Sequence, residues 1–163
     1  LGLAPHIPLA THGRYSRDEV LAAVGEGSIE KPPQLREGVK WASDEQIDLF
    51  FVTLQKSESS YSPTTMYRDY AISPELFHWE SQSTTSEASP TGQRYINHAK
   101  TGSSVLLFVR DRKTGPTGGA APYTCLGPAT YAEHRDERPM AITWALRTPM
   151  RQELFEAARA VAA

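Results

Sequence analysis

Residues 47–55 read IDLFFVTLQ, and residues 103–110 read SSVLLFVR. Both stretches are nearly continuous in apolar, β-branched or aromatic side chains, which favours strands in the core of a sheet. Each is too short to cross a bilayer as a helix, because a spanning helix needs about 20 apolar residues. The two stretches therefore predict core strands at Ile47 to Gln55 and at Val105 to Arg110.

Alternating side chains and turn residues predict further strands on either side of this core. In residues 76–83, apolar or small side chains alternate with polar ones, as in a half-buried strand. A strand over residues 123–132 contains a Gly-Pro pair, so a bulge or bend is expected there. The remaining predicted strands cover residues 38–42, 70–73 and 140–146.

Capping residues mark the start of three predicted helices. In each case a Ser or Thr that can accept a hydrogen bond precedes the first turn, and twice Pro takes the first helical position. Gly92 lowers the helix propensity of the second helix. The caps and helices are Ser16 with Glu19 as a capping box for residues 17–24, Ser89 for residues 90–98, and Thr148 for residues 149–162.

The order of these elements indicates the fold class. Strands and helices do not alternate regularly, so a doubly wound sheet is excluded. We expect an α+β domain whose strand-rich sheet forms a half-open twisted barrel, with short N-terminal and C-terminal helices. A length of 163 residues suits one hydrophobic core, so residues 1–163 are expected to form a single recognition domain.

Composition gives no general sign of nucleic-acid binding. The chain has 17 Lys and Arg and 19 Asp and Glu, a net charge of −2, so any surface for a polyanion must be local. A hydrophobic fraction of 39% fits a folded globular domain. Cys125 can form no internal disulfide, which favours a reducing cytoplasm, and the first residues lack a basic, apolar leader, so we expect no secretion.

Common enzyme signatures are absent from the sequence. It has no P-loop, dinucleotide fingerprint or nucleophile elbow, and its five histidines are scattered, so we expect no metal and no cofactor. His78 and Glu80 share one face of a predicted strand and could form an acid/base pair, but exposed polar positions of any strand look the same. We therefore expect a non-catalytic domain, with a small hydrolase at this pair as the weakest alternative.

Groups suited to nucleic acid are densest between residues 77 and 96, FHWESQSTTSEASPTGQRYI. This stretch supplies hydroxyls, amides, an arginine and an aromatic ring, which are groups that contact phosphate oxygens and bases. A Trp in a strand is more often part of the core, however, and a polar loop of this kind can be ordinary protein surface. Arg110, Arg112 and Lys113 form a small basic edge typical of solvated charge. The candidate DNA-binding residues are Tyr61, Ser62, Arg68, Trp79, Ser81, Gln82, Ser83, Thr84, Thr85, Gln93 and Arg94.

Several longer motifs carry a resemblance to a known family. They are DLFFVTLQKSESSYSPTTMYRDYAIS, LFHWESQSTTSEASPTGQRYINH, GSSVLLFVRD, PYTCLGPATY and RPMAITWALRTPM. Over residues 9–150 they resemble a bacterial domain of unknown function found at the C-terminus of helicases with phospholipase-D-type nuclease domains, and also attached to His-Asn-His endonucleases. The resemblance implies a helicase-associated module in modification-dependent restriction or phage defence and, by analogy, a PUA-like or SRA-like barrel that performs base flipping.

The motifs and the resemblance together favour a DNA reader that senses modified DNA for a helicase or nuclease. In this hypothesis the aromatic rings test a flipped base, the amides read its edge, and Arg68 and Arg94 contact phosphate. The alternative is a protein–protein docking domain of a helicase that makes no nucleic-acid contact, which the net charge of −2 also fits. The sequence leaves open which DNA modification is read and whether the DNA is single- or double-stranded.

Overall fold

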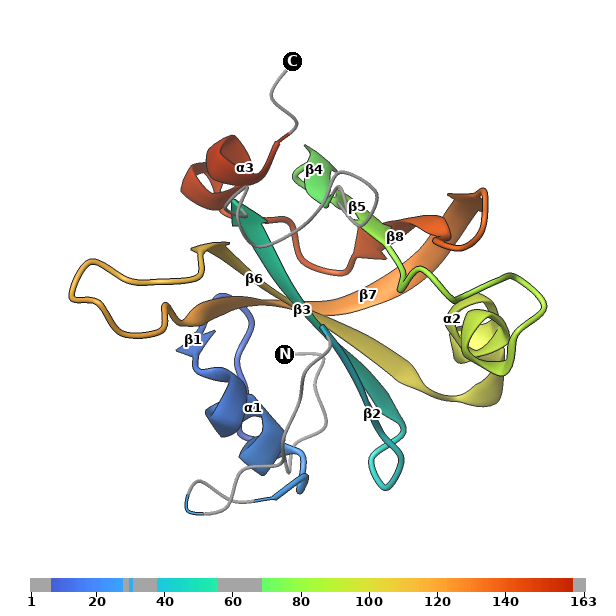
Figure 1. The fold of residues 1–163 in the computed structure, drawn as a ribbon, viewed down its shortest axis with the longest axis horizontal. Helices are drawn as coiled ribbons and strands as arrows, with labels where there is room; N and C mark the ends of the chain where they lie inside the picture. The colour runs from blue at the N-terminus through green and yellow to red at the C-terminus, as the bar shows by residue number, and fades with distance from the viewer. Residues whose placement is uncertain (1–6, 28–29, 31–37, 56–68, 160–163) are drawn as a thin grey trace.

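The computed structural model describes residues 7–27, 30, 38–55 and 69–159, and its strands join into one mixed sheet (Figure 1). The sheet order is β2-β3-β6-β7-β8-β5-β4, and β1 pairs with β7. β3 and β6 are parallel, and the other pairings are antiparallel. The elements are β1 (Arg14–Tyr15), α1 (Arg17–Ala23), β2 (Val39–Ala42), β3 (Ile47–Gln55), β4 (Tyr70–Ser73), β5 (Leu76–Glu80), α2 (Pro90–Thr101), β6 (Ser104–Arg112), β7 (Tyr123–Arg135), β8 (Ala141–Leu146) and α3 (Gln152–Ala158).

The two apolar stretches of the sequence are β3 and β6, which lie side by side within the sheet. Side chains of β3 point alternately to two core clusters: Phe50 and Val52 to the larger one, Leu49 and Phe51 to the smaller one. The side chains of β6 alternate between the same two clusters. Burial on both faces explains why these strands are apolar at nearly every position.

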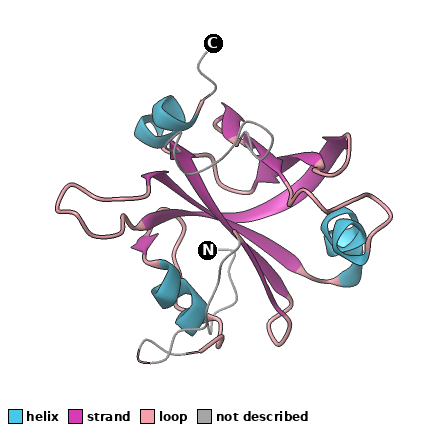
Figure 2. Cartoon of the chain, viewed as in Figure 1, coloured by secondary structure: helices cyan, strands magenta, loops and turns pink. Residues whose placement is uncertain are grey.

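The helices lie at the periphery of the strands (Figure 2). α1 covers the smaller cluster with Val20 and Leu21, which are fully buried. Its first turn contains the predicted capping box: Ser16 Oγ accepts from the Glu19 N–H at 3.1 Å, and a Glu19 carboxylate oxygen accepts from the Ser16 N–H at 2.7 Å. Within the described residues, no helix has the length and apolar character that a membrane span requires.

α2 connects β5 to β6 and packs against β6 and β7. His98, near its C-terminal end, is buried, and its Nε2 accepts from the Tyr131 N–H at 3.0 Å. Burial lowers the pKa of His98, which keeps the ring neutral and able to accept this bond. The helix ends at Gly102, whose left-handed φ of 81° suits glycine.

Among the described strands the sheet does not close on itself, because β2 and β4 are the two ends of the strand order. The strand-rich mixed sheet and the three short helices of the described residues confirm the predicted α+β class and the half-open arrangement. The bend expected in β7 is confirmed at Gly127, which has a φ of 85° and lies at a shift in the β6–β7 register. An added Cβ at this glycine would meet the Thr11 side chain at 2.7 Å.

The C-terminal helix differs from its prediction at residues 149–162. α3 begins only at Gln152, because the N–H of Met150 donates to the Pro74 carbonyl at 2.8 Å and its side chain is buried. The N-cap is therefore Arg151 in place of Thr148, and residues 160–163 lie outside the described part. The strand predicted at 123–132 also continues to Arg135, which shortens the turn before β8.

Candidate nucleic-acid interface

The polar loop between β5 and α2 is fixed by hydroxyl side chains that point inward. Ser81, Thr85 and Ser86 are buried. Ser81 Oγ accepts from the Met140 N–H at 2.8 Å, and the Ser81 N–H donates to the Met140 carbonyl at 2.9 Å. Ser81 and Thr85 were predicted to face DNA, and the structure buries both residues where the loop meets β8 and the turn before it.

The same loop is joined to the start of α2. Ser89 caps the helix, because its Oγ accepts from the Gly92 N–H at 3.0 Å. A Cβ on Gly92 would overlap the Ser86 carbonyl, so only glycine allows the loop to approach the helix this closely. Gly92, which weakened the helix prediction, is therefore required by the packing of the first turn.

Three of the predicted loop residues do lie at the surface. Ser83 and Thr84 are exposed, and Gln82 is half-buried. Gln93 is exposed on α2, but its amide nitrogen donates to the Glu87 carbonyl at 2.7 Å and its oxygen accepts from Asn97 at 2.9 Å. The structure thus brings these four residues to one end of the molecule.

Trp79 was predicted to stack on a base, and the structure places it in the core. Its side chain is only 4% exposed and belongs to the larger core cluster. The indole stacks on Phe50 with ring centroids 4.1 Å apart and an interplanar angle of 3°. With so little of its side chain exposed, Trp79 packs as a core residue in this structure.

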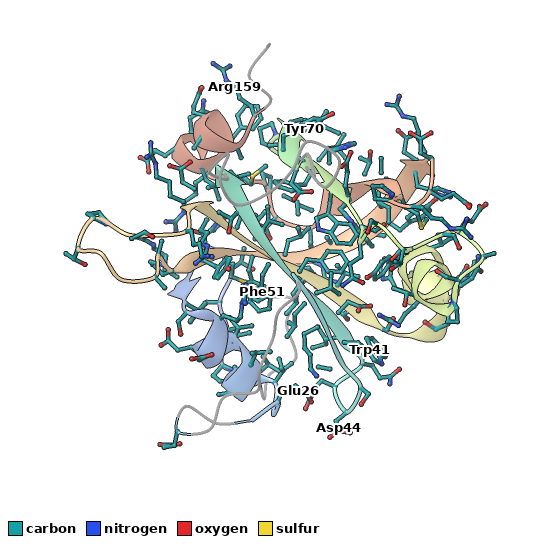
Figure 3. The ribbon with its side chains drawn as sticks, in the orientation of Figure 1. Glu26, Trp41, Asp44, Phe51, Tyr70 and Arg159 are labelled. Carbon is teal, nitrogen blue, oxygen red and sulfur yellow. The ribbon has the colours of Figure 1, made fainter. Side chains whose placement is uncertain are left out.

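Arg94 was predicted to contact phosphate, and the structure gives it a different partner. Its guanidinium donates to both carboxylate oxygens of Asp48, at 2.8 and 2.9 Å, and lies over the ring of Trp41 at 4.5 Å. Trp41 is placed on β2 (Figure 3). Arg94 therefore ties α2 to the β2–β3 end of the sheet.

The predicted residues Tyr61, Ser62 and Arg68 lie outside the described residues.

Acidic side chains dominate the surroundings of the first polar loop. The loop contacts the β7–β8 turn through the Arg138 N–H, which donates to the Thr85 carbonyl at 2.8 Å. It contacts the end of β7 through Glu87, which lies 3.5 Å from His134. Residues 80–87 and 133–138 together carry five carboxylates and two arginines, a net charge of −3. Such a surface repels phosphate, so the loop is poorly suited to grip a DNA backbone.

The predicted acid/base pair on β5 is brought together by the strand. His78 Nε2 lies 3.9 Å from a Glu80 carboxylate oxygen, and the imidazole stacks on Tyr70 with ring centroids 4.5 Å apart. Burial lowers the pKa of His78, while Glu80 opposes this shift. A hydrolytic role of this pair stays a prediction. Among the described residues, no three His, Cys, Asp or Glu side chains are grouped to hold a metal.

A basic surface lies where the chain turns from β6 into β7. We define the basic hairpin surface as Arg14, Arg17, Arg110, Arg112 and Lys113. The connection between the two strands extends away from the sheet, and β1 lies near its base (Figure 1). Arg14 pairs with Thr124 of β7, which brings the N-terminal cations to the same end of β7 as the hairpin.

Arg110 holds the base of this hairpin. Its guanidinium donates to the carbonyls of Ala121 and Lys113, at 3.1 and 3.3 Å, and to Thr53 Oγ1 at 2.8 Å. It also lies over the ring of Tyr123, 4.4 Å from the centroid. Arg110 therefore fixes where the hairpin leaves the sheet.

Arg17 reaches the same tyrosine from α1. Its guanidinium donates to the Tyr123 hydroxyl at 3.1 Å and lies over the ring of Phe51 at 5.2 Å. Figure 3 shows Phe51 near the centre of the sheet, and it belongs to the cluster that α1 covers. Burial lowers the pKa of Arg110, Tyr123 opposes this shift, and the charge of Arg17 adds to it. The two cations are thus close enough to repel each other.

The charge of the basic hairpin surface contrasts with that of the polar loop. Residues 14–19 and 110–113 carry five cations and three carboxylates, a net charge of +2. Arg14, Arg112 and Lys113 are exposed, and the ion pair of Arg112 with Asp111, at 3.6 Å, is also solvent-exposed. The sequence showed the basic edge at 110–113, but β1 and α1 join it only through the tertiary fold.

Comparison with known proteins places the chain in a family. Residues 9–158 match the family described as Domain of unknown function (DUF3427). No curated protein matches the chain. The chain is similar to the 5-hydroxymethylcytosine-specific restriction enzyme AbaSI, with a TM-score of 0.42 and 10% identity over 71% of this chain and 33% of that one. It thus spans about a third of that enzyme. Because the family match covers most of the sequence, the chain belongs to the DUF3427 family.

Proposed function

We propose that this domain binds DNA and that the basic hairpin surface contacts the phosphate backbone. The observation that supports the proposal is the convergence of five cations from β1, α1, β6 and the hairpin at one end of the sheet. Arg and Lys side chains supply most of the affinity of proteins for phosphate backbones. The net charge of −2 does not oppose this, because residues 14–19 and 110–113 carry a local net charge of +2.

The finer part of the proposal is that the domain reads a DNA modification for a larger enzyme. The motifs listed from the sequence support this through their resemblance to modules attached to helicases and nucleases. In this role the domain itself carries no catalysis, works in the cytoplasm and flips or inspects a modified base. The hydroxyls of the exposed Ser83 and Thr84 and the amide of the half-buried Gln82 suit contacts to a base edge or sugar.

Fluorescence-anisotropy titration tests both parts. Matched duplexes, unmodified, base-methylated, hydroxymethylated and phosphorothioated, are titrated with the domain at low and near-physiological salt. We expect binding to all four at low salt and a preference for one modified duplex that persists at higher salt. Binding that is equal for all duplexes and erased by salt would reduce the proposal to a DNA clamp without modification sensing.

A paired substitution tests the surface itself. Arg112→Gln with Lys113→Gln should weaken binding to every duplex and reduce the slope of log affinity against log salt by about 2, because each phosphate contact contributes roughly 0.9. The control is Arg135→Gln with Arg138→Gln, two exposed arginines near the acidic loop, which should leave the slope unchanged. If only the control variant reduced the slope, the DNA interface would lie at the polar loop between β5 and α2 instead.

The second candidate function is docking to a protein. The acid-rich surface formed by residues 80–87 and 133–138 favours a basic partner. Failure to bind any duplex, together with co-purification of one helicase or nuclease partner, would support docking over DNA binding.

A further inference from the structure

The connection between β6 and β7 is an ordered ribbon. The Lys113 carbonyl accepts from the Ala121 N–H at 3.0 Å, and the Gly115 N–H donates to the Gly119 carbonyl at 2.7 Å. Between these bonds Thr114 and Ala120 form an isolated antiparallel bridge. The two arms of the hairpin are therefore paired up to the turn at its tip, and Arg110 fixes both arms at the base.

Gly115 and Gly119 of this ribbon are not explained by the fold. Gly118, in contrast, has a φ of 92°, where glycine is favoured. Gly119 has no left-handed φ, and an added Cβ would meet nothing within 4 Å. Gly115 also has no left-handed φ, and its nearest contacts would lie at 3.6 and 3.8 Å, which is ordinary van der Waals separation. An alanine would thus fit at both Gly115 and Gly119 in the isolated domain.

Glycine also serves where another molecule approaches the backbone closely. The hairpin tip is exposed, and the cations Arg112 and Lys113 stand at its base. A two-stranded ribbon has the dimensions that fit the major groove of a duplex, where a small tip can approach base edges while cations reach the phosphates on either side. Residues 110–122 contain no aromatic side chain, whereas proteins that hold single strands rely on aromatic stacking.

We propose that the hairpin of residues 113–121 enters the major groove of double-stranded DNA, with the backbone at Gly115 and Gly119 in contact with the DNA. This inference rests on the proposed DNA-binding function and adds the type of nucleic acid and the element that enters it. Arg112 and Lys113 bind phosphates at the groove edge. Arg110 is a positioning residue, because its guanidinium holds the hairpin arms and Thr53 rather than the DNA.

The test compares the native domain with the double variant Gly115→Ala, Gly119→Ala in titrations of duplex and single-stranded DNA of the same sequence. We expect the midpoint of thermal unfolding to stay unchanged and the affinity for the duplex to fall about tenfold, as for the loss of one good groove contact. Thr130→Ala, at an exposed position of β7 outside the hairpin, is the control and should bind as the native domain does.

The outcomes separate this inference from the proposed function. Equal duplex affinity of the native domain and the glycine variant would overturn groove entry and leave DNA binding intact. Equal loss on duplex and single strand would overturn the assignment to the groove. Absence of any DNA binding by the native domain would overturn the proposed function and the inference with it.

A second measurement needs no variant. Guanine N7 lies in the major groove, so the native domain should protect it from methylation by dimethyl sulfate within its binding site. Binding without such protection would place the hairpin outside the major groove. The protection experiment tests groove entry even if the double glycine variant does not fold.

Discussion

Asp48 is a fully buried carboxylate on β3, and its charge is balanced by that of Arg94. Burial raises the pKa of Asp48, and the two hydrogen bonds and the charge of Arg94 oppose this shift. The carboxylate in turn raises the pKa of Arg94. A buried charge of this kind is tolerated only while its partner stays in place.

Replacement of Arg94 by Met should therefore destabilise the fold. The buried carboxylate of Asp48 would lose its partner, and we expect the free energy of unfolding to fall by about 3 kcal/mol. Urea denaturation followed by tryptophan fluorescence measures this change. Duplex affinity of the folded variant should stay unchanged, because Arg94 contacts Asp48 in place of phosphate.

The matched control for Arg94→Met is the double variant with Asp48→Asn. Removal of both charges should recover part of the lost stability, because neither charge is then buried alone. If the double variant lost as much unfolding free energy as the two single variants lose together, the pair would contribute through packing only.

At the scale of elements, α2 and the loop before it form one packed unit. Ser89 caps the helix, Gly92 lets the Ser86 carbonyl approach the first turn, and Ser81 ties the other end of the loop to Met140. His98 joins the far end of the helix to Tyr131 of β7. The crossover to β6 is thus held at both ends.

Gly92→Ala should loosen this unit. The added Cβ overlaps the Ser86 carbonyl, so the loop must shift, and we expect a loss of about 2 kcal/mol in the free energy of unfolding. Thermal and chemical denaturation measure it. Gly119→Ala is the comparison, because its Cβ meets nothing, and it should change stability by less than about 0.5 kcal/mol. Equal stability of both variants would contradict the packing argument.

At the scale of the whole molecule, Cys125 reports on the integrity of the sheet. It is fully buried in the smaller core cluster, on the strand that pairs with β1, β6 and β8. Burial raises the pKa of the Cys125 thiol to about 11, with an opposing backbone hydrogen bond at Gly127. The thiol is therefore both inaccessible and protonated at neutral pH.

Alkylation of Cys125 should consequently follow global unfolding. We expect negligible labelling by iodoacetamide of the native domain at pH 8 and labelling in urea that rises with the unfolded fraction. Mass spectrometry after timed exposure measures it. Rapid labelling without denaturant would mean that α1 and the N-terminal segment open separately from the sheet.

Elements whose signals are local could be predicted from the amino-acid sequence. The apolar runs of β3 and β6, the capping box of α1 and the Gly127 bend all follow from neighbouring residues, and so does the α+β class. The location of the candidate site, in contrast, depends on contacts between residues far apart in the chain. Trp79 and Arg94 have the chemistry of DNA contacts. In the fold, however, Trp79 is buried against Phe50 and Arg94 is paired with Asp48, and both partners are distant in sequence. The basic hairpin surface arises because β1 pairs with β7, which brings Arg14 beside residues almost 100 positions away, and such long-range pairing leaves no periodic signal in the chain.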